Sequence, residues 1–270
     1  MKVRSILLIT ASMLMLSACA TTTKDSVSSV DRSQFLLLPA SDVDAMSAQS
    51  YQQTLSTAKE SKTLNVDKAM LNRITTISKR LIAQVGVFRP DATKWDWQVN
   101  VEKNDALNAY CMPGGKIMVY SGLVEKIDAT DDELAAVIGH EIAHALREHG
   151  RERMSQAYVQ QYGMQALVAL AGGGTTGQLI AQGGQKGTEL FFTLPNGREQ
   201  EREADRLGLE LAARAGYNPN AAVSLWQKMN AENQEAPPEF FSTHPSNANR
   251  IKDLQALAPK VMTLYEQAEK

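Results

Sequence analysis

The stretch His140-Glu141-Ile142-Ala143-His144 constrains the fold most, because its chemistry depends on one backbone conformation. Residues four apart lie on one face of an α-helix, so a helix would point both imidazoles at one ion. Glu141 would be turned about 100° from His140, too far to be a third ligand but near enough to reach a water molecule there. Thr130 and Glu133 have capping-box spacing just before an apolar run. The sequence therefore predicts a helix that carries a divalent metal site.

A catalytic zinc ion takes three protein ligands and leaves one position open, so a third ligand is needed. A histidine six residues after His144 would be one solution, but Gly150 stands there. We interpret His149 as a surface or capping residue near the helix C-terminus, where a cation is favoured. No Asp or Glu occurs between Arg153 and Thr188, so the third ligand should be a carboxylate further along the chain.

The helix that opens at Arg198 offers that carboxylate on one face. Glu201 and Asp205 share this face with small residues that suit close helix packing, namely Ala204, Gly208 and Ala212. An acidic pair on a packed face is costly unless it binds something. We therefore predict Glu201 as a ligand and Asp205 as the group that holds a ligand imidazole by its other nitrogen. The charged residues of the opposite face are expected to be solvated, namely Glu199, Glu203, Arg206 and Glu210. The alternatives are an ordinary surface helix here and purely structural histidines at positions 140 and 144.

The N-terminus has the pattern of a targeting segment. Two basic residues precede an apolar stretch that is too short to span a bilayer, and Leu16-Ser17-Ala18-Cys19 follows. This tetrapeptide resembles the lipobox of bacterial lipoproteins, and a plain secretory signal is the alternative. We expect residues 1–18 to be a lipoprotein signal peptide and Cys19 to be acylated. Residues 19–40 would form a flexible tether, because residues 20–34 are rich in Thr, Ser and Asp. The folded domain with the predicted metal site would span residues 41–270.

Charge and cysteine content limit the partners. The net charge of −2 and the absence of a basic stripe argue against nucleic-acid binding. Acylation of Cys19 would leave Cys111 as a single thiol, either buried or reactive, and its apolar surroundings favour burial.

The remaining patterns predict a few further elements. Apolar periodicity predicts a helix over residues 67–85, and Ser41 is a candidate cap for a helix that ends near Ala58. Alternation predicts a strand over 95–101, and a second short strand is expected over 116–120, after the turn Pro113-Gly114-Gly115. The Gly-rich segment 171–187 is expected to be a mobile loop or lid. It contains a G-x-G-x-x-G pattern, but the acidic residue that a dinucleotide site needs is missing.

Together these motifs resemble the HtpX and CAAX-prenyl-protease class of zinc metallopeptidases, in particular its periplasmic lipoprotein branch of LoiP- and BepA-like proteins. The resemblance covers about residues 60–258. Its pieces are Asn108-Ala109-Tyr110, Pro113-Gly114-Gly115, Tyr120-Ser121-Gly122-Leu123, the HEIAH stretch, the pair Glu201 and Asp205, and Thr243-His244-Pro245 to Arg250. The chain departs from the integral-membrane members because it shows no transmembrane helices. It departs from the branch members with tetratricopeptide arrays because none follows residue 258.

The resemblance implies an α+β, mostly helical, zincin-like fold with an active-site helix, a small edge-stranded sheet and C-terminal helices. It implies one zinc ion held by His140, His144 and Glu201, with Glu141 as the general base. It also implies a strand near Ile117 to Tyr120 that pairs with an extended substrate. Ile117, Val119 and Arg250 are the expected substrate contacts. His244 would either stabilise the oxyanion or bind the open zinc position and silence the enzyme.

The expected function is that of an endopeptidase on the periplasmic face of a Gram-negative outer membrane, held there by the lipid on Cys19. Its substrates would be unfolded or misassembled envelope proteins, and the outer-membrane assembly machinery is a possible partner. The alternative is a chaperone or assembly factor for outer-membrane proteins with latent protease activity. A purely structural zinc protein would leave Glu141 and an open fourth position unexplained.

Overall fold

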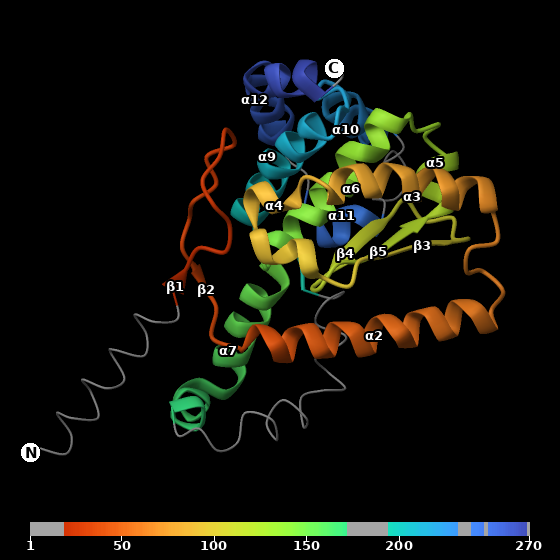
Figure 1. Ribbon diagram of the computed structural model, residues 1–270. Coiled ribbons are helices and arrows are strands. Elements are labelled where there is room, and N and C mark those ends of the chain that lie inside the picture. The colour runs from red at the N-terminus through yellow and green to blue at the C-terminus, as the bar shows by residue number, and fades with distance from the viewer. Residues whose placement is uncertain (1–18, 172–193, 232–238, 246–247, 269–270) are drawn as a thin grey trace, which may run out of the picture.

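The computed structural model describes residues 19–171, 194–231, 239–245 and 248–268. Helices surround a small sheet in this part of the chain (Figure 1), as the α+β, mostly helical expectation requires. The expected signal peptide 1–18 and nearly all of the expected lid 171–187 lie outside the described residues. The described helices include none that is both long and apolar enough to cross a membrane.

The elements follow one another along the described chain. The strands are β1 (Cys19–Ala20), β2 (Gln34–Phe35), β3 (Gln98–Glu102), β4 (Ala109–Met112) and β5 (Lys116–Tyr120). The helices before the metal centre are α2 (Ala40–Glu60), α3 (Lys68–Ile82), α4 (Val85–Phe88), the 3-10 helix η1 (Pro90–Lys94) and α5 (Ser121–Glu125). The remaining helices are α6 (Asp131–Leu146), α7 (His149–Ala171), α9 (Arg198–Arg214), α10 (Ala221–Ala231), α11 (Glu239–Thr243) and α12 (Ala248–Ala268). Helix α2 begins at Ala40 after Pro39, so Ser41 is not its cap, contrary to the prediction.

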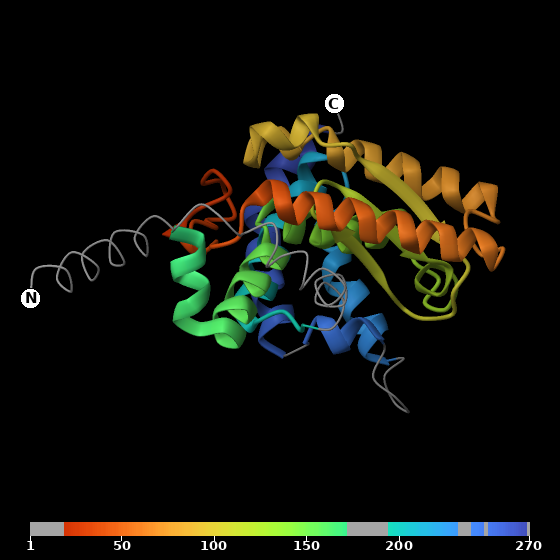
Figure 2. The ribbon, with the colours of Figure 1, turned by 90° about the horizontal axis from the view of Figure 1, so that it is seen from below.

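The sheet of β3, β4 and β5 separates two apolar layers. Strand β5 lies in the centre, parallel to β3 and antiparallel to β4. Helix α2 runs across one face (Figure 2), where Tyr51 packs with Met112 and Met118. The other face joins the main core, which includes residues of α3, α6 and α9. The β4–β5 turn needs glycine, because Gly115 has φ +82° and a Cβ there would lie 2.6 Å from the Trp97 ring.

The sheet order corrects the expected substrate strand. Ile117 and Val119 lie on central β5, fully buried, and β5 is already paired on both sides. A strand paired on both sides has no backbone groups left for a substrate. The edge strand on this side is β4, whose short, mostly buried sequence lacks the alternation that reveals a strand.

Helices α6 and α9 cross at glycine residues. A Cβ on Gly208 would lie 2.7 Å from the backbone nitrogen of His140, and a Cβ on Gly139 would lie 3.0 Å from the carbonyl oxygen of Gly208. The small face predicted for α9 therefore does pack against another helix, and it brings the α9 carboxylates beside the α6 histidines.

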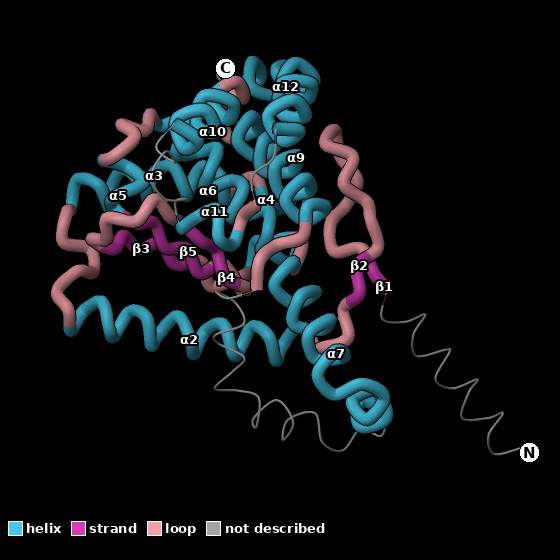
Figure 3. Tube along the Cα trace, turned by 180° about the vertical axis from the view of Figure 1, so that it is seen from behind, coloured by secondary structure: helices cyan, strands magenta, loops and turns pink. Residues whose placement is uncertain are grey.

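The segment after Cys19 is part of the folded body, which corrects the expected flexible tether. Strands β1 and β2 pair with each other and lie beside α7 (Figures 1 and 3). Leu36 and Leu38 are buried, and the backbone nitrogens of Leu37 and Leu38 bind Ser155 Oγ at 3.1 and 3.2 Å. The polar side chains of this segment, whose abundance indicated disorder, instead contact buried polar groups of α7 and α9.

Candidate metal centre

Helix α6 begins with the capping box that its sequence predicts. Thr130 Oγ1 accepts a hydrogen bond from the backbone nitrogen of Glu133 at 3.3 Å, and Glu133 Oε2 accepts one from the backbone nitrogen of Thr130 at 2.9 Å. Glu133 also accepts hydrogen bonds from Ser224 Oγ and Lys228 Nζ, each at 2.7 Å, which ties the start of α6 to α10. This fixed start sets the rotation of α6 and so the direction of its two histidines.

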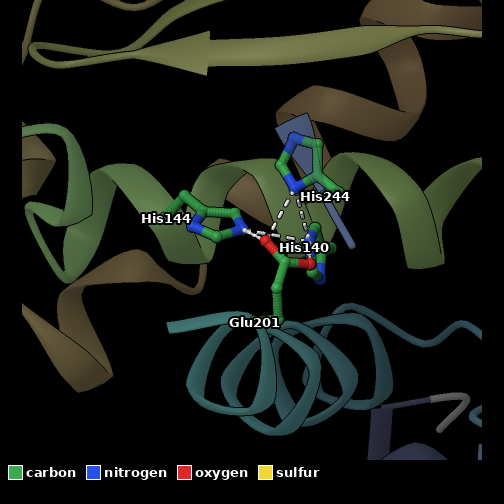
Figure 4. A group of neighbouring side chains, drawn as sticks. All are labelled: His140, His144, Glu201 and His244. Atoms are coloured by element: carbon green, nitrogen blue, oxygen red, sulfur yellow. Dashed lines mark hydrogen bonds and ion pairs between the residues drawn. The ribbon is translucent and has the colours of Figure 1, made fainter. Parts of the chain in front are cut away.

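Three side chains predicted from the sequence meet between α6 and α9 (Figure 4). The Nε2 atoms of His140 and His144 lie 3.0 Å apart. Glu201 points from α9 toward them, with Oε1 3.3 Å from His144 Nε2 and Oε2 3.5 Å from His140 Nε2. The structure therefore brings together the three residues that were expected to hold the metal.

His244 completes this group from the end of α11. Its Nδ1 lies 3.0 Å from Glu201 Oε1 and 3.4 Å from His140 Nε2. Its ring stacks on Phe240 with centroids 4.2 Å apart, and its Nε2 lies 3.7 Å from Glu141 Oε1. The four ligand atoms lie within 4.8 Å of one another. His244 therefore stands at the fourth side of the site, next to Glu141.

The charges around the site favour a cation. Burial acts to lower the pKa of His140, but the carboxylates of Asp205 and Glu201 raise it to about 9. Burial also opposes ionisation of Glu201, yet the imidazoles, with His244 first, hold its pKa well below the usual range. Burial keeps the pKa of His144 well below its usual value, so this imidazole is neutral and available as a ligand. Burial raises the pKa of Glu141.

Asp205 orients His140 from behind, as its place on the α9 face predicts. Its Oδ1 lies 3.0 Å from His140 Nδ1. Arg250 donates to both Asp205 oxygens at 2.6 Å, and its Nη1 lies 2.8 Å from Glu201 Oε2. The guanidinium is buried against these carboxylates, and Arg250 does not line the cavity beside Glu141, so its expected role as a substrate contact stays a prediction. Its charge offsets the two buried acids of α9.

A second line of hydrogen-bond contacts runs behind His144, and the sequence patterns did not predict it. His144 Nδ1 lies 2.8 Å from Nδ1 of His149, whose Nε2 lies 2.9 Å from Glu203 Oε2. The predictions of a surface His149 and a solvated Glu203 and Glu210 are wrong, because all three side chains are buried. The folded N-terminal segment covers this part of the molecule, and Glu210 accepts a hydrogen bond from the backbone of Ser28 at 2.7 Å. The sequence feature that could have indicated the contact between these two histidines is the position of His149, five residues after His144.

A cavity of about 120 Å³ opens beside these residues. Its lining joins Glu141 and His144 to strand β4, to residues 242–244 and to Arg153. Cys111 of β4 also lines it, and burial raises the pKa of this free thiol well above its usual value. The thiol is therefore buried and protonated, as its apolar surroundings predict.

The donors fit a zinc ion. Imidazole nitrogens and a carboxylate oxygen are the ligands of catalytic zinc sites, and a polar side chain stands behind each histidine, Asp205 behind His140 and His149 behind His144. Within the described residues, Glu141 Oε1 is buried without a hydrogen-bond partner, so this oxygen faces the site with its acceptor capacity unused. The set resembles a three-ligand catalytic centre with an acid–base residue beside it.

Comparison with known proteins agrees with this geometry. A mitochondrial metalloendopeptidase, OMA1 of Saccharomyces cerevisiae, is 32% identical over 185 residues, which is 66% of this chain and 51% of that protein. The bovine OMA1 metalloendopeptidase is 34% identical over 186 residues, 66% of this chain and 35% of that protein. The beta-barrel assembly-enhancing protease of Escherichia coli is 26% identical over 212 residues, 75% of this chain and 42% of that protein.

The chain thus spans about half or less of the length of these relatives. The profile of peptidase family M48 matches residues 69–258, well over half of the chain, and includes His140, His144 and Glu201. Members of this family are zinc metallopeptidases, and the buried His-His-Glu group between α6 and α9 has the ligands that such an enzyme needs. The chain therefore belongs to peptidase family M48.

Proposed function

We propose that this protein is a zinc endopeptidase that cleaves unfolded or misassembled proteins of the bacterial envelope. His140, His144 and Glu201 hold the zinc ion, and Glu141 is the general base. The observation that carries the proposal is the cavity in which Glu141 and His144 stand next to strand β4. A peptide in this cavity would lie against both the acid–base residue and the ligand group.

Glu141 carries the proton in this reaction. When bound, zinc lowers the pKa of water and polarises a peptide carbonyl. Glu141 accepts a proton from the attacking water, whose oxygen forms a bond to the carbonyl carbon. As the C–N bond breaks, Glu141 delivers the proton to the leaving amine. Its raised pKa brings the carboxylate closer to neutral pH, where both transfers are efficient.

The substrate would bind as an extended segment alongside β4. This strand is the outer strand on its side of the sheet, and residues 109–112 line the cavity. Main-chain pairing gives affinity with little demand on sequence. Because a folded protein seldom offers an extended segment, this arrangement favours unfolded chains over compact ones.

We further propose that the protein works on the periplasmic face of an outer membrane, anchored by lipid on Cys19. The lipobox-like residues 16–19 support this location. The similarity to a protein named beta-barrel assembly-enhancing protease supports envelope proteins as substrates and the outer-membrane assembly machinery as a partner. Several acyl chains on one cysteine would make the attachment stable. Radiolabelled palmitate incorporation into wild type but not into Cys19→Ser tests the anchor.

Degradation of casein by the purified chain, with Glu141→Gln alongside, tests the activity. The variant keeps the size of the side chain but cannot accept the proton. We expect the wild type to cleave casein and Glu141→Gln to bind zinc without cleaving. Equal cleavage by both proteins would sink the proposal.

The position of His244 favours a second candidate, an assembly factor or chaperone whose protease activity is latent. His244 Nδ1 lies among the ligand atoms, where it would occupy the position that water needs. In that case neither wild type nor Glu141→Gln cleaves casein although both bind zinc, and both prevent aggregation of an unfolded outer-membrane protein.

A further inference from the structure

The two α6 histidines are held from behind in different ways. Asp205 lies directly against His140 Nδ1, whereas the Nδ1 of His144 is connected to a carboxylate through His149. A metal-binding imidazole must present a bare nitrogen, so the position of its proton matters. For His144, that position is set by the partners of His149.

The hydrogen bonds determine the tautomer of His149 first and, through it, the tautomer of His144. A carboxylate oxygen accepts, so His149 Nε2, which lies 2.9 Å from Glu203 Oε2, is the donor and carries a proton. In a neutral imidazole that donates from Nε2, the other ring nitrogen, Nδ1, is the acceptor. That nitrogen accepts from His144 Nδ1 at 2.8 Å, which must then be the protonated nitrogen of His144. His144 Nε2 is left bare and faces Glu201 and His140.

This arrangement of protons depends on a carboxylate held in one position, and Glu203 is almost wholly buried. A second buried carboxylate, Glu152, stands beside it. Two neighbouring buried carboxylates are costly unless cations pair with them. Arg147 approaches Glu203 Oε2, with Nη2 at 3.1 Å and Nε at 3.2 Å. The second guanidinium comes from the N-terminal segment.

Arg32 binds both carboxylates in a forked arrangement. Its Nε lies 2.6 Å from Glu203 Oε1 and its Nη2 lies 3.2 Å from Glu203 Oε2. Its Nη1 and Nη2 lie 2.7 and 2.9 Å from the two oxygens of Glu152. Burial opposes ionisation of Glu152, but the hydrogen bonds led by that of Arg32 lower its pKa. Arg147 and His149 contact Oε2 of Glu203, whereas Arg32 Nε contacts Oε1, so Arg32 fixes the plane of this carboxylate.

We propose that Arg32 is a positioning residue for the metal site. It holds Glu203 in one orientation, and Glu203 acts through His149 to keep the Nε2 of His144 bare toward the metal. The segment after Cys19 thereby contributes to metal binding, a role that its distance from the ligands in the sequence conceals. This inference rests on the proposed zinc site and adds a determinant of its affinity.

Zinc competition against a chelator, with the purified full chain in detergent, tests the inference. Arg32→Gln should raise the zinc dissociation constant about tenfold, the lower end of the effect of losing a partner behind a metal ligand. Arg32→Lys should fall between this variant and wild type, because it keeps the charge but not the fork. Arg206→Gln is the matched control: Arg206 Nε holds the same segment by Ser28 O at 2.8 Å. It should bind zinc as wild type does.

A second readout follows the tautomers without zinc. In ¹⁵N spectra of the zinc-free chain, wild type should show His149 protonated at Nε2 and His144 at Nδ1. Arg32→Gln should show mixed tautomers for both rings. If Arg32→Gln does not fold, Arg32→Gln/Glu152→Gln, which removes a buried charge with its counter-charge, takes its place with the same expectations.

Three outcomes are decisive against the inference or its basis. Unchanged zinc affinity and tautomers in the Arg32 variant overturn it. Equal weakening by Arg206→Gln also overturns it, because the effect would then come from loosening the segment. A wild-type chain that binds no zinc instead overturns the proposed function, which separates the two failures.

Discussion

Asp205 Oδ1 lies 3.0 Å from His140 Nδ1, on the side of the ring away from the ligand group. The same carboxylate takes two hydrogen bonds from Arg250, whose Nη1 also lies 2.8 Å from Glu201 Oε2. One acid thus connects the orientation of a ligand imidazole to the charge balance of the ligand carboxylate. Zinc binding and fold stability should respond together when Asp205 changes.

Asp205→Asn should therefore weaken both properties. The variant leaves Arg250 with one buried counter-charge fewer, and breaking a buried ion pair costs about 3–5 kcal/mol of unfolding free energy. Loss of the charged partner behind His140 should raise the zinc dissociation constant about 10–100-fold. Urea denaturation and chelator competition measure the two effects. Asp131→Asn is the control, because its ion pair with Arg73 is exposed; identical behaviour of the two variants would contradict the prediction.

The parts of the site that lie close together in sequence were predictable. The capping box at Thr130 fixes where α6 begins, and the four-residue spacing of His140 and His144 then determines their common face. Glu201 could be found because its neighbours on the α9 face are small, which marks a packed surface. Local spacing and helix periodicity carry this information, and neither needs long-range contacts.

The rest depended on segments that no local pattern brings together. Glu203 has the periodicity of a solvated residue, but it is buried and contacts Arg32 of the N-terminal segment. Arg250 lies within a segment that resembles the family, but its partner Asp205 lies 45 residues away. Strand β4 is an edge strand because β3 pairs with the other side of β5, and this pairing joins segments that no local pattern connects. A polar composition also suits a segment that neutralises buried charges, so composition alone misidentified the N-terminal segment.

Gly208→Ala should destabilise the protein although it replaces glycine in a helix. Such a change in an unobstructed helix would stabilise it by about 0.5–1 kcal/mol. Here the new Cβ would lie 2.7–2.9 Å from backbone atoms of residues 139 and 140, so the helices must move apart. We expect a net loss of about 1–3 kcal/mol, the usual cost of overpacking. Denaturant unfolding measures it.

Gly197→Ala serves as the control for this variant. A Cβ on Gly197 would lie 3.9 Å from the nearest atom, so it would cause no clash. The substitution then acts only through the weaker preference of alanine for the N-cap position, which costs less than about 1 kcal/mol of unfolding free energy. If Gly208→Ala were as stable as Gly197→Ala or wild type, the close α6–α9 approach would be wrong.

Glu133 should make the unfolding free energy depend on pH in the acidic range. Burial acts to raise its pKa, but hydrogen bonds from Lys228, the backbone of Thr130 and Ser224 outweigh it, so the folded-state pKa is lowered from 4.5. The stabilisation is therefore complete above the unfolded pKa and is lost as pH falls through the folded pKa. Glu133→Gln should lower the unfolding free energy at pH 7, with the difference from wild type shrinking below pH about 4.3. Urea melts across pH 3–7 measure it, and a constant difference would contradict the prediction.

His244→Ala should separate latency from catalysis. If His244 Nδ1 occupies the fourth position of the ligand group, its removal opens that position, so cleavage of casein at saturating zinc should rise while zinc affinity falls. His244→Ala/Glu141→Gln should remain inactive, which shows that any gained cleavage passes through Glu141. The opposite result, loss of cleavage with zinc still bound, would mean that His244 Nε2 acts on the substrate beside Glu141, where it lies 3.7 Å from Oε1. Initial rates and zinc content of the same preparations distinguish these outcomes.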